Sequence, residues 1–405
     1  MLTVSIMHIL IAPNAFKNSL TAGAAANAIR TGLQQSRLSC TCECFPIGDG
    51  GDGTGELLID KLGGSRIATP VNDPLGRPIT ASYGLAVTTA SNDPASTTAS
   101  QGLASTTAII EMTAASGLRL LDPSELDPLH ASSIGTGELM LAALEKGARQ
   151  LFLAVGGSAT VDGGIGILHA LGIRFLDAQN QPLPPEPAQL IHLESIDCSG
   201  LHPAMKQARL TIGCDVDNPL LGPNGAAAIF GPQKGATPAV VQQLETGLAR
   251  LRDITLAATG KDMGSIPHGG AAGGTAAGCW ALLGAALVNG ADYFLELTGF
   301  SNSLKNADLV ITGEGSIDAQ TLQGKGPYAV ARLARLSNIP VIGLAGRIPL
   351  ENEPTLAPYF NALFAIGNEP STLPQAIAAT EANLIRCGFS IGNLLGLHST
   401  PYKTL

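Results

Sequence analysis

Short apolar, strand-like runs alternate with helical stretches near the start of this chain. The first run, residues 8–12, is rich in β-branched and aliphatic side chains and precedes an Ala-rich helical stretch. A second run covers residues 42–47, after which a glycine-rich loop at 48–55 leads into a helical segment at 56–62. Strands that alternate with helices in this way predict a parallel α/β sheet.

Strand-like runs return near the other end of the chain. They are separated by helical stretches such as 327–336, and they cover residues 308–312, 340–345 and 362–366. Because the pattern is the same, we interpret them as the same sheet resumed. The prediction is a discontinuous, Rossmann-like α/β domain formed by residues 1–64 and 290–405.

The middle of the chain, residues 65–289, predicts a second, inserted α/β domain. It opens with a hairpin-like order at 66–83. Further strands are expected at 108–112, 150–155 and 209–214, and helices at 137–146 and 237–254. A chain of 405 residues exceeds the usual size of one hydrophobic core, so we expect two domains with the active site in the cleft between them. The Ser/Thr-rich stretch 88–107 predicts a surface loop without a functional role.

Composition and charge exclude several classes of protein function. Hydrophobic residues make up 45% of the chain and charged residues 14%, which favours a large buried core. A formal charge of -9 argues against nucleic-acid partners, because phosphate contacts need a basic surface. No apolar run reaches the roughly 18 residues that cross a bilayer, and residues 1–13 lack the features of a signal peptide. We therefore expect a cytoplasmic protein with no membrane partner.

The seven cysteines are expected to be reduced thiols in a reducing compartment. Their count is odd, and most of them lie in apolar or strand-like segments. Cys40, Cys42 and Cys44 alternate, so they are expected on one face of a strand. A buried strand explains them better than a metal site, since no second Cys/His pair lies nearby.

The first candidate cluster follows the first two predicted strands, and ligands bind parallel sheets at the carboxyl ends of strands. Lys17 and Ser19 follow one strand, and an Asp/Gly-rich loop with Asp49, Asp52 and Thr54 follows the other. Glycines let backbone N–H groups face an anion, while carboxylates hold magnesium or a hydroxyl. We expect Lys17 and Asp49 to be catalytic and the other three residues to bind substrate. Because Asp-Gly pairs also form ordinary turns, both interpretations stay open.

A second cluster, residues 156–164, joins a strand at 151–155 to a helical segment at 165–171. Its glycines permit a phosphate to approach the backbone closely, and its hydroxyl groups can donate hydrogen bonds to the phosphate oxygens. The N-terminus of the following helix favours the negative charge of the phosphate. The order matches neither the P-loop nor the dinucleotide motif. A tight strand-to-helix turn is the structural alternative. We predict that the ATP phosphates bind here, at Gly156, Gly157, Ser158 and Thr160.

A third cluster combines Asp215 with Asn218 and Pro219, and Lys234 follows in the segment 230–235. Asp and Asn oxygens suit magnesium, and lysine suits phosphate. We expect Asp215 to be catalytic and to bind the metal, and Lys234 to bind substrate. An Asx-Pro turn is the alternative.

The fourth cluster, residues 312–318, follows a buried strand at 309–311. Carboxylates at the mouth of such a strand are costly unless they serve a ligand or a metal. Glu314 and Asp318 are therefore predicted metal ligands, and Asp318 a catalytic residue as well. Lys325, which follows, is predicted to bind ATP.

This inventory fits phosphoryl transfer better than hydrolysis. The seven histidines are scattered, and no Ser/His/Asp or Cys/His order is present. Transfer from ATP needs lysines, magnesium-binding carboxylates and backbone N–H groups, with one carboxylate to orient the attacking hydroxyl. We therefore expect ATP and Mg²⁺ as cofactors.

In this order, the four clusters resemble those of the type I glycerate kinases, from about Met7 to at least Gly346. The matching segments are residues 12–17, 19–20, 49–51, 112–117, 135–138, 156–164, 230–235, 269–274 and 312–318. The resemblance implies that ATP phosphorylates glycerate to phosphoglycerate. Because the family generally phosphorylates the 2-hydroxyl, 2-phosphoglycerate is favoured over 3-phosphoglycerate.

Three positions depart from the family pattern. Relatives usually carry Asp at Asn14, Glu at Asp52 and Asn at Val161. Asp52 keeps its charge with a shorter reach, so its role is expected to remain. Asn14 has lost a charge, and we assign it neither a metal nor a base role. Residues before Met7 lie outside the pattern.

Two other functions stay open. One is a kinase for another small hydroxy acid or sugar, because a fold does not determine the substrate. The other is a non-catalytic nucleotide-binding regulator, which would not need carboxylates clustered beside lysines. The sequence leaves both a monomer and a homodimer possible.

Overall fold

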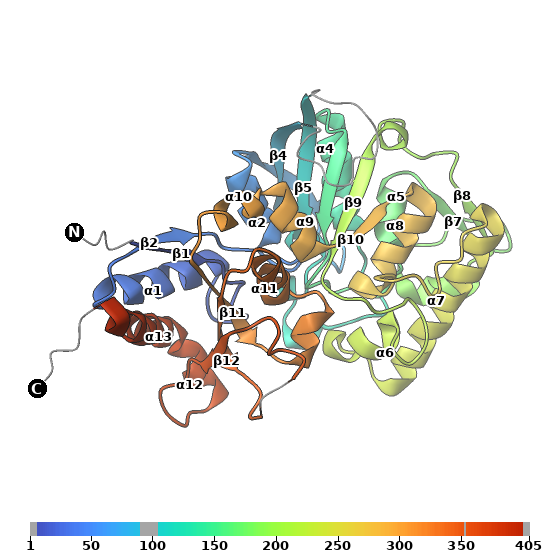
Figure 1. The fold of residues 1–405 in the computed structure, drawn as a ribbon. Coiled ribbons are helices and arrows are strands. Elements are labelled where there is room, and N and C mark those ends of the chain that lie inside the picture. Colours follow the sequence, from blue (N-terminus) through green and yellow to red (C-terminus); the bar gives the residue numbers. More distant parts are fainter. Residues whose placement is uncertain (1–5, 90–103, 352–353, 400–405) are drawn as a thin grey trace, which may run out of the picture. The chain divides into compact units, whose positions relative to one another are not determined.

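The computed structural model describes residues 6–89, 104–351 and 354–399 (Figure 1). The chain forms two compact units. Unit 1 combines Met1–Asp49 with Phe294–Leu405, and unit 2 is Gly50–Tyr293. Both units contain sheets with parallel strands and packed helices, so the predicted α/β class is confirmed.

Unit 1 is built on a five-stranded sheet in the order β13-β12-β11-β1-β2, in which all neighbours are parallel. Its strands are β1 (Met7–Ile11), β2 (Cys40–Cys44), β11 (Leu309–Ser316), β12 (Val341–Arg347) and β13 (Ala362–Ala365). Its helices are α1 (Ala22–Gln35), α10 (Phe300–Leu304), α11 (Gly326–Leu336), α12 (Leu373–Ala378) and α13 (Thr380–Leu395). The two ends of the chain therefore share one sheet.

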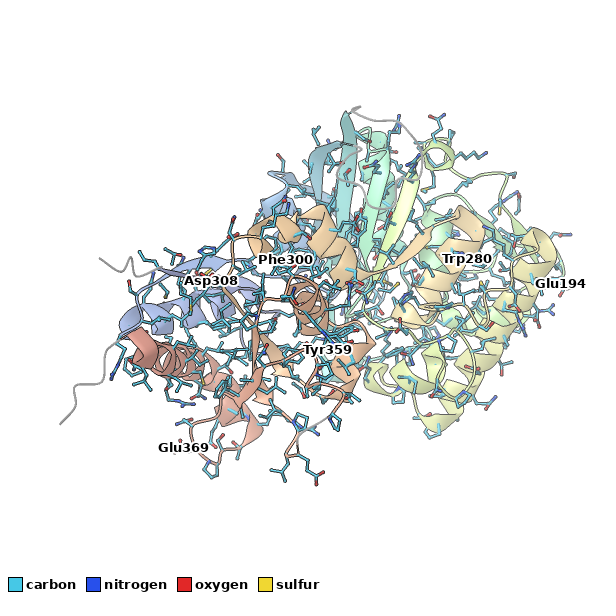
Figure 2. The ribbon with its side chains drawn as sticks, in the orientation of Figure 1. Glu194, Trp280, Phe300, Asp308, Tyr359 and Glu369 are labelled. Carbon is cyan, nitrogen blue, oxygen red and sulfur yellow. The ribbon has the colours of Figure 1, made fainter. Side chains whose placement is uncertain are left out.

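The core of unit 1 explains why its strands read as apolar runs. Ile9 and Ile11 of β1 are fully buried, because helices cover both faces of a parallel sheet. Helices α1 and α13 lie side by side (Figure 1), with Gly32 so close to α13 that a side chain would overlap its backbone. Phe300, labelled in Figure 2, packs edge to face on Phe45, with ring centroids 5.1 Å apart.

Unit 2 contains a six-stranded sheet in the order β10-β9-β6-β5-β4-β3. The strands β3 to β5 are antiparallel, and β5, β6, β9 and β10 are parallel. The strands are β3 (Ser65–Asn72), β4 (Pro78–Thr89), β5 (Ala104–Glu111), β6 (Gln150–Ala154), β9 (Arg209–Cys214) and β10 (Ala286–Asn289), with β7 (Arg174–Leu176) and β8 (Ser195–Asp197) forming a separate pair.

Eight helices are found in the described part of the segment from 54 to 297. They are α2 (Thr54–Lys61), α3 (Thr113–Ser116), α4 (Ile134–Glu145), α5 (Ile165–Ala170), α6 (Ala226–Phe230), α7 (Pro238–Thr259), α8 (Thr275–Leu283) and α9 (Gly290–Leu297). One core cluster packs α4 against the large sheet, and a second forms around α5, α7 and α8.

Two predicted boundaries need correction. The helix α2, which the sequence analysis assigned to the domain of the chain ends, belongs to unit 2. The reason is packing, because Ile59 of α2 lies so close to Gly84 of β4 that a side chain there would overlap it. The predicted loop at 88–107 is shorter than expected, since β4 runs to Thr89 and β5 begins at Ala104. The rest of that loop, 90–103, lies outside the described residues.

The structure bears on the expected absence of a membrane-spanning segment and on the expected strand that contains three cysteines. In the described residues, no helix combines the length and the apolar character needed to cross a membrane. Cys40, Cys42 and Cys44 lie on β2, as predicted, and are partly buried. The Cys44 thiol donates to the carbonyl of Ala26 in α1, so this strand face packs on a helix.

Candidate active site

The predicted site residues fall into two sets, one in each unit. Unit 1 holds Lys17, Ser19, Asp49, Glu314, Asp318 and Lys325. Unit 2 holds Asp52, Thr54, Gly156, Gly157, Ser158, Thr160, Asp215 and Lys234.

Glu314 is the centre of the set in unit 1. It lies on β11 and is 7% exposed. The pKa of Glu314 is raised to about 7, chiefly by burial and also by the nearby Asp49 carboxylate, while Lys325 and Lys17 act to lower it. These four residues come from separate segments of the chain, and the fold brings two carboxylates and two lysines together.

Asp49 is held by an amide that sequence reasoning left without a role. Asn14 Nδ2 donates to Asp49 Oδ2 at 2.7 Å, and both side chains are buried. The other end of the amide, Asn14 Oδ1, accepts from the backbone N–H of Ala15 at 2.8 Å. Asn14 is thus fixed at both ends and orients one oxygen of Asp49.

A buried hydroxyl links the two acidic residues of the fourth cluster. Thr321 is fully buried, and its Oγ1 donates to Glu314 Oε1 at 3.3 Å. Thr321 Oγ1 also accepts a hydrogen bond of 3.1 Å from the backbone N–H of Asp318. Sequence reasoning missed Thr321, because a lone threonine after a strand carries no distinguishing signal. Lys325, whose backbone N–H donates to the Thr321 carbonyl, is the N-cap residue of α11.

Ser19 makes a structural contact. Its hydroxyl donates to the backbone carbonyl of Ile377 in α12 at 2.7 Å. This hydrogen bond ties the segment after β1 to the C-terminal part of unit 1. The predicted substrate role of Ser19 therefore remains a prediction with a competing structural role.

Lys234 is the centre of one set in unit 2. It is 3% exposed, and its Nζ donates to Ser158 Oγ at 2.9 Å and to the Thr160 carbonyl at 2.7 Å. Burial lowers the pKa of Lys234 to about 7, although Asp162 and Asp215 act to raise it. The Lys234 side chain thus links the third predicted cluster to the second, the loop 156–164.

Asp162 is a second residue that sequence reasoning did not assign. It is fully buried and accepts from Ser133 Oγ at 2.6 Å and from the Ser133 and Gly164 N–H groups at 2.9 Å. These hydrogen bonds hold the loop 156–164 against the N-terminus of α4, because Ser133 is the N-cap residue of that helix. In the described residues, the buried Thr160 Oγ1 has no hydrogen-bond partner.

The loops of unit 2 approach one another closely at their glycines. The Gly156 N–H donates to the Gly50 carbonyl at 3.0 Å. A Cβ atom on Gly156 would lie 2.6 Å from Gly51 Cα and 3.0 Å from Asp215 Oδ2, so only glycine fits there. The segment that begins at Gly50 therefore contacts the loop after β6, which in turn lies close to Asp215 in the loop after β9. The loops after β6 and β9 lie together because these strands are parallel neighbours in one sheet.

The acidic loop after Gly50 forms the remaining set. Thr54 is buried, and its Oγ1 accepts from the Gly50 N–H at 3.0 Å, which closes the loop on itself. Thr113 Oγ1 donates to Asp52 Oδ1 at 3.0 Å, and Arg119 Nε lies 3.9 Å from the same oxygen. Arg119 also lines an open pocket of about 540 Å³.

A protein family model covers most of this chain. The model of the family described as "Glycerate kinase family" matches residues 9–396. The chain belongs to the glycerate kinase family. This confirms the family predicted from the clusters, and it confirms the predicted enzyme class, a phosphotransferase.

Several members of the glycerate kinase family align with nearly the whole chain. The glycerate kinase of Halalkalibacterium halodurans is 40% identical over 369 residues, which are 91% of this chain and 93% of the relative. The glycerate 2-kinase of Escherichia coli is 38% identical and covers 96% of this chain and 98% of its own length. A crystal structure from Salmonella typhimurium LT2, provisionally assigned to glycerate kinase 2, has a TM-score of 0.79 at 37% identity and covers 97% of this chain and 99% of its own.

Membership in a kinase family implies ATP as the phosphate donor, and the metal is a separate question. Among the residues that the structure describes, no three His, Cys, Asp or Glu side chains are grouped to hold a metal ion. The predicted ligands lie in different units, with Asp215 in unit 2 and Glu314 and Asp318 in unit 1. In unit 1 the carboxylate pair of Asp49 and Glu314 has the chemistry that suits a hard cation.

Proposed function

We propose that this glycerate kinase family member transfers the terminal phosphate of ATP to a hydroxyl of glycerate, which yields phosphoglycerate and ADP. The observation that carries the proposal is the group around Glu314, where two carboxylates and two lysines lie together. Phosphoryl transfer needs positive charge around the moving phosphate and a carboxylate that orients the acceptor hydroxyl. The family match supports glycerate as the acceptor.

The side chains of unit 1 are proposed to act on the transferred phosphate and the acceptor. Lys17 and Lys325 would bind anionic oxygens, and Asp49, oriented by Asn14, would accept a hydrogen bond from the acceptor hydroxyl. Asp318 is proposed as a further catalytic carboxylate. We propose that Mg²⁺ is held by carboxylates drawn from Asp215, Glu314 and Asp318. When bound, the metal would neutralise charge on the phosphates of ATP.

The loops of unit 2 are proposed to bind ATP phosphates and to contribute to acceptor binding. Gly156 and Gly157 let the backbone approach a phosphate closely, and Ser158 and Thr160 supply hydroxyls. Lys234 lies against this loop through Ser158 Oγ and the Thr160 carbonyl. A phosphate near Lys234 Nζ would favour the charged ammonium, because an opposite charge raises the pKa of a buried lysine.

The position of phosphorylation is a finer proposal. We propose the 2-hydroxyl, and therefore 2-phosphoglycerate, which the glycerate 2-kinase of Escherichia coli supports at 38% identity. A kinase for another small hydroxy acid or sugar remains the second candidate. A panel of glycerate, lactate, tartronate and glyceraldehyde at equal concentrations separates the two, because the proposal expects glycerate to have the highest kcat/KM.

The test is ADP formation from ATP and Mg²⁺ with and without glycerate. The proposal expects ADP to form at a substantial rate only when glycerate is present. Lys17→Ala in unit 1 and Lys234→Met in unit 2 should each reduce this rate by at least about a hundredfold, as for charged groups that stabilise a transition state. An equal rate of ADP formation without glycerate contradicts the proposal.

A further inference from the structure

Glu111 is an acidic residue beside the loop 50–54 that the sequence analysis did not single out. It is the last residue of β5 and is partly buried. Its Oε1 accepts a hydrogen bond of 2.7 Å from the backbone N–H of Gly55, the second residue of α2. The N-cap of this helix is Gly53, which has no side chain to accept from the first turn. Glu111 therefore satisfies one of the N–H groups that the helix leaves open.

This contact leaves no room for a larger residue at Gly55. A Cβ atom there would lie 2.6 Å from Glu111 Cγ and 3.1 Å from its carboxyl carbon. The helical backbone at Gly55 does not require glycine for its conformation, because its φ is not positive. The glycine is thus explained by the approach of Glu111.

The loop before α2 is fixed from two directions. Inside the loop, Thr54 Oγ1 accepts from the Gly50 N–H. From outside, Glu111 at the end of β5 accepts from the Gly55 N–H. Thr113, the first residue of α3, donates to Asp52 Oδ1 at 3.0 Å. The position of Asp52 relative to the sheet therefore depends on groups at the carboxyl end of β5.

The charge of Glu111 changes near neutral pH. Burial, which is the largest cause, and the carboxylates of Asp52 and Glu56 together raise the pKa of Glu111 to about 7. The Gly55 N–H and the Arg119 guanidinium favour the charged form. A charged carboxylate accepts the Gly55 hydrogen bond more strongly and also stabilises the N-terminus of α2.

We propose that Glu111 is a positioning residue for acceptor binding, which fixes the loop 50–54 through Gly55 and so orients Asp52 toward a small hydroxy acid. The inference rests on the proposed function, in which this loop contributes to glycerate binding. It predicts that the ionised form of Glu111 holds the loop in its binding conformation. The KM for glycerate should then rise as the pH falls through about 7, while the KM for ATP stays constant.

The experiment compares wild type, Glu111→Gln and Glu56→Gln between about pH 5.5 and about pH 8.5. Glu111→Gln keeps the shape and an acceptor oxygen but removes the charge. At pH 8 we expect its KM for glycerate to be raised about tenfold, as for a lost charge-assisted hydrogen bond, with no change in KM through pH 7. Glu56→Gln removes a charge from the same first turn without touching Gly55. It should bind glycerate like wild type at pH 8, with the pH transition moved to lower pH.

Wild-type KM values for Glu111→Gln, with the pH transition still present, would overturn the inference. If Glu111→Gln does not fold, Gly55→Ala tests the same contact from the helix side, since the added methyl group displaces Glu111. The KM for glycerate in Gly55→Ala should also rise, and an unchanged KM overturns the inference. A wild-type protein that does not turn over glycerate contradicts the proposed function instead, so the two failures are distinguishable.

Discussion

Asn14 donates a hydrogen bond of 2.7 Å to Asp49 within unit 1, and both side chains are buried. The resemblance to the family pattern implies a carboxylate at the position of this amide. An amide there donates to Asp49, whereas an ionised carboxylate would repel it. This chain therefore holds Asp49 with a neutral neighbour.

Replacing Asn14 with Asp should make stability depend on pH. The new carboxyl group would be buried beside Asp49, so its pKa would be raised in the folded state. Its protonated form can still donate to Asp49, and stability should therefore fall as the pH rises from about 4 to about 7. We expect Asn14→Asp to lose about 1–3 kcal/mol of unfolding free energy relative to wild type over that range. Urea unfolding at several pH values measures this, and a constant difference would refute it.

Lys234 should make the free energy of unfolding depend on pH with the opposite sign. Its pKa is lowered to about 7 in the folded protein, so the unfolded chain binds more protons above that pH. Stability contributed by this group should rise with pH between about 7 and about 10, by at most about 1.4 kcal/mol per pH unit. Lys234→Met should lack this rise. Equal slopes of unfolding free energy against pH in the two proteins would count against a neutralised lysine.

Gly157 offers a test of the proposed phosphate loop with a matched control. Its φ is +76°, and a Cβ atom would lie 2.7 Å from Thr113 Cγ2. Gly157→Ala should cost about 1–3 kcal/mol of stability because of the backbone strain, and it should raise the KM for ATP at least tenfold, or about 1.4 kcal/mol. Gly147 has a φ of +91° with open space around it, so Gly147→Ala carries similar strain away from the loop.

Kinetics and thermal unfolding of both variants complete that comparison. We expect both to lose stability, but only Gly157→Ala to bind ATP more weakly. If the two variants have the same KM for ATP, the loop 156–164 does not bind the nucleotide.

Glu314 should determine the requirement for magnesium. If its carboxylate is a ligand, Glu314→Gln should raise the Mg²⁺ concentration for half-maximal activity at least about tenfold, since an amide is a weaker ligand. Asp308→Asn is the control, because Asp308 (Figure 2) precedes the same strand and accepts from the His8 N–H. The same magnesium dependence in Glu314→Gln, Asp308→Asn and wild type would exclude Glu314 as a ligand. Full activity in excess chelator would exclude the metal itself.

The sheets could be predicted from the sequence because buried parallel strands leave a strong local signal. Residues such as Ile9 and Ile11 form continuous apolar runs, since helices cover both faces of the sheet. Clustering of the loops after β6 and β9 also followed from local information, because the carboxyl ends of parallel strands lie at one edge. The glycines at 156 and 157 were informative for the same reason.

The supporting residues could not be found in this way. Glu111, Asp162 and Thr321 each act through contacts with segments that are distant in the sequence or through burial that only the fold creates. Ser19 likewise makes a contact that its local sequence does not indicate, because its hydroxyl donates to a backbone carbonyl 358 residues away. The assignment of α2 failed since its packing partner, Gly84, belongs to another part of the chain.

The central claim is that glycerate receives the phosphate of ATP, and proton-coupled phosphorus NMR of the reaction mixture tests it directly. The account predicts that ATP signals decrease while ADP and one phosphomonoester appear in equal amounts. The phosphomonoester signal should be a doublet, because the phosphate of 2-phosphoglycerate couples to the single proton on carbon 2. A triplet would show transfer to the 3-hydroxyl and correct the position alone. ADP and inorganic phosphate without a phosphomonoester, or no change when glycerate is present, would contradict the account.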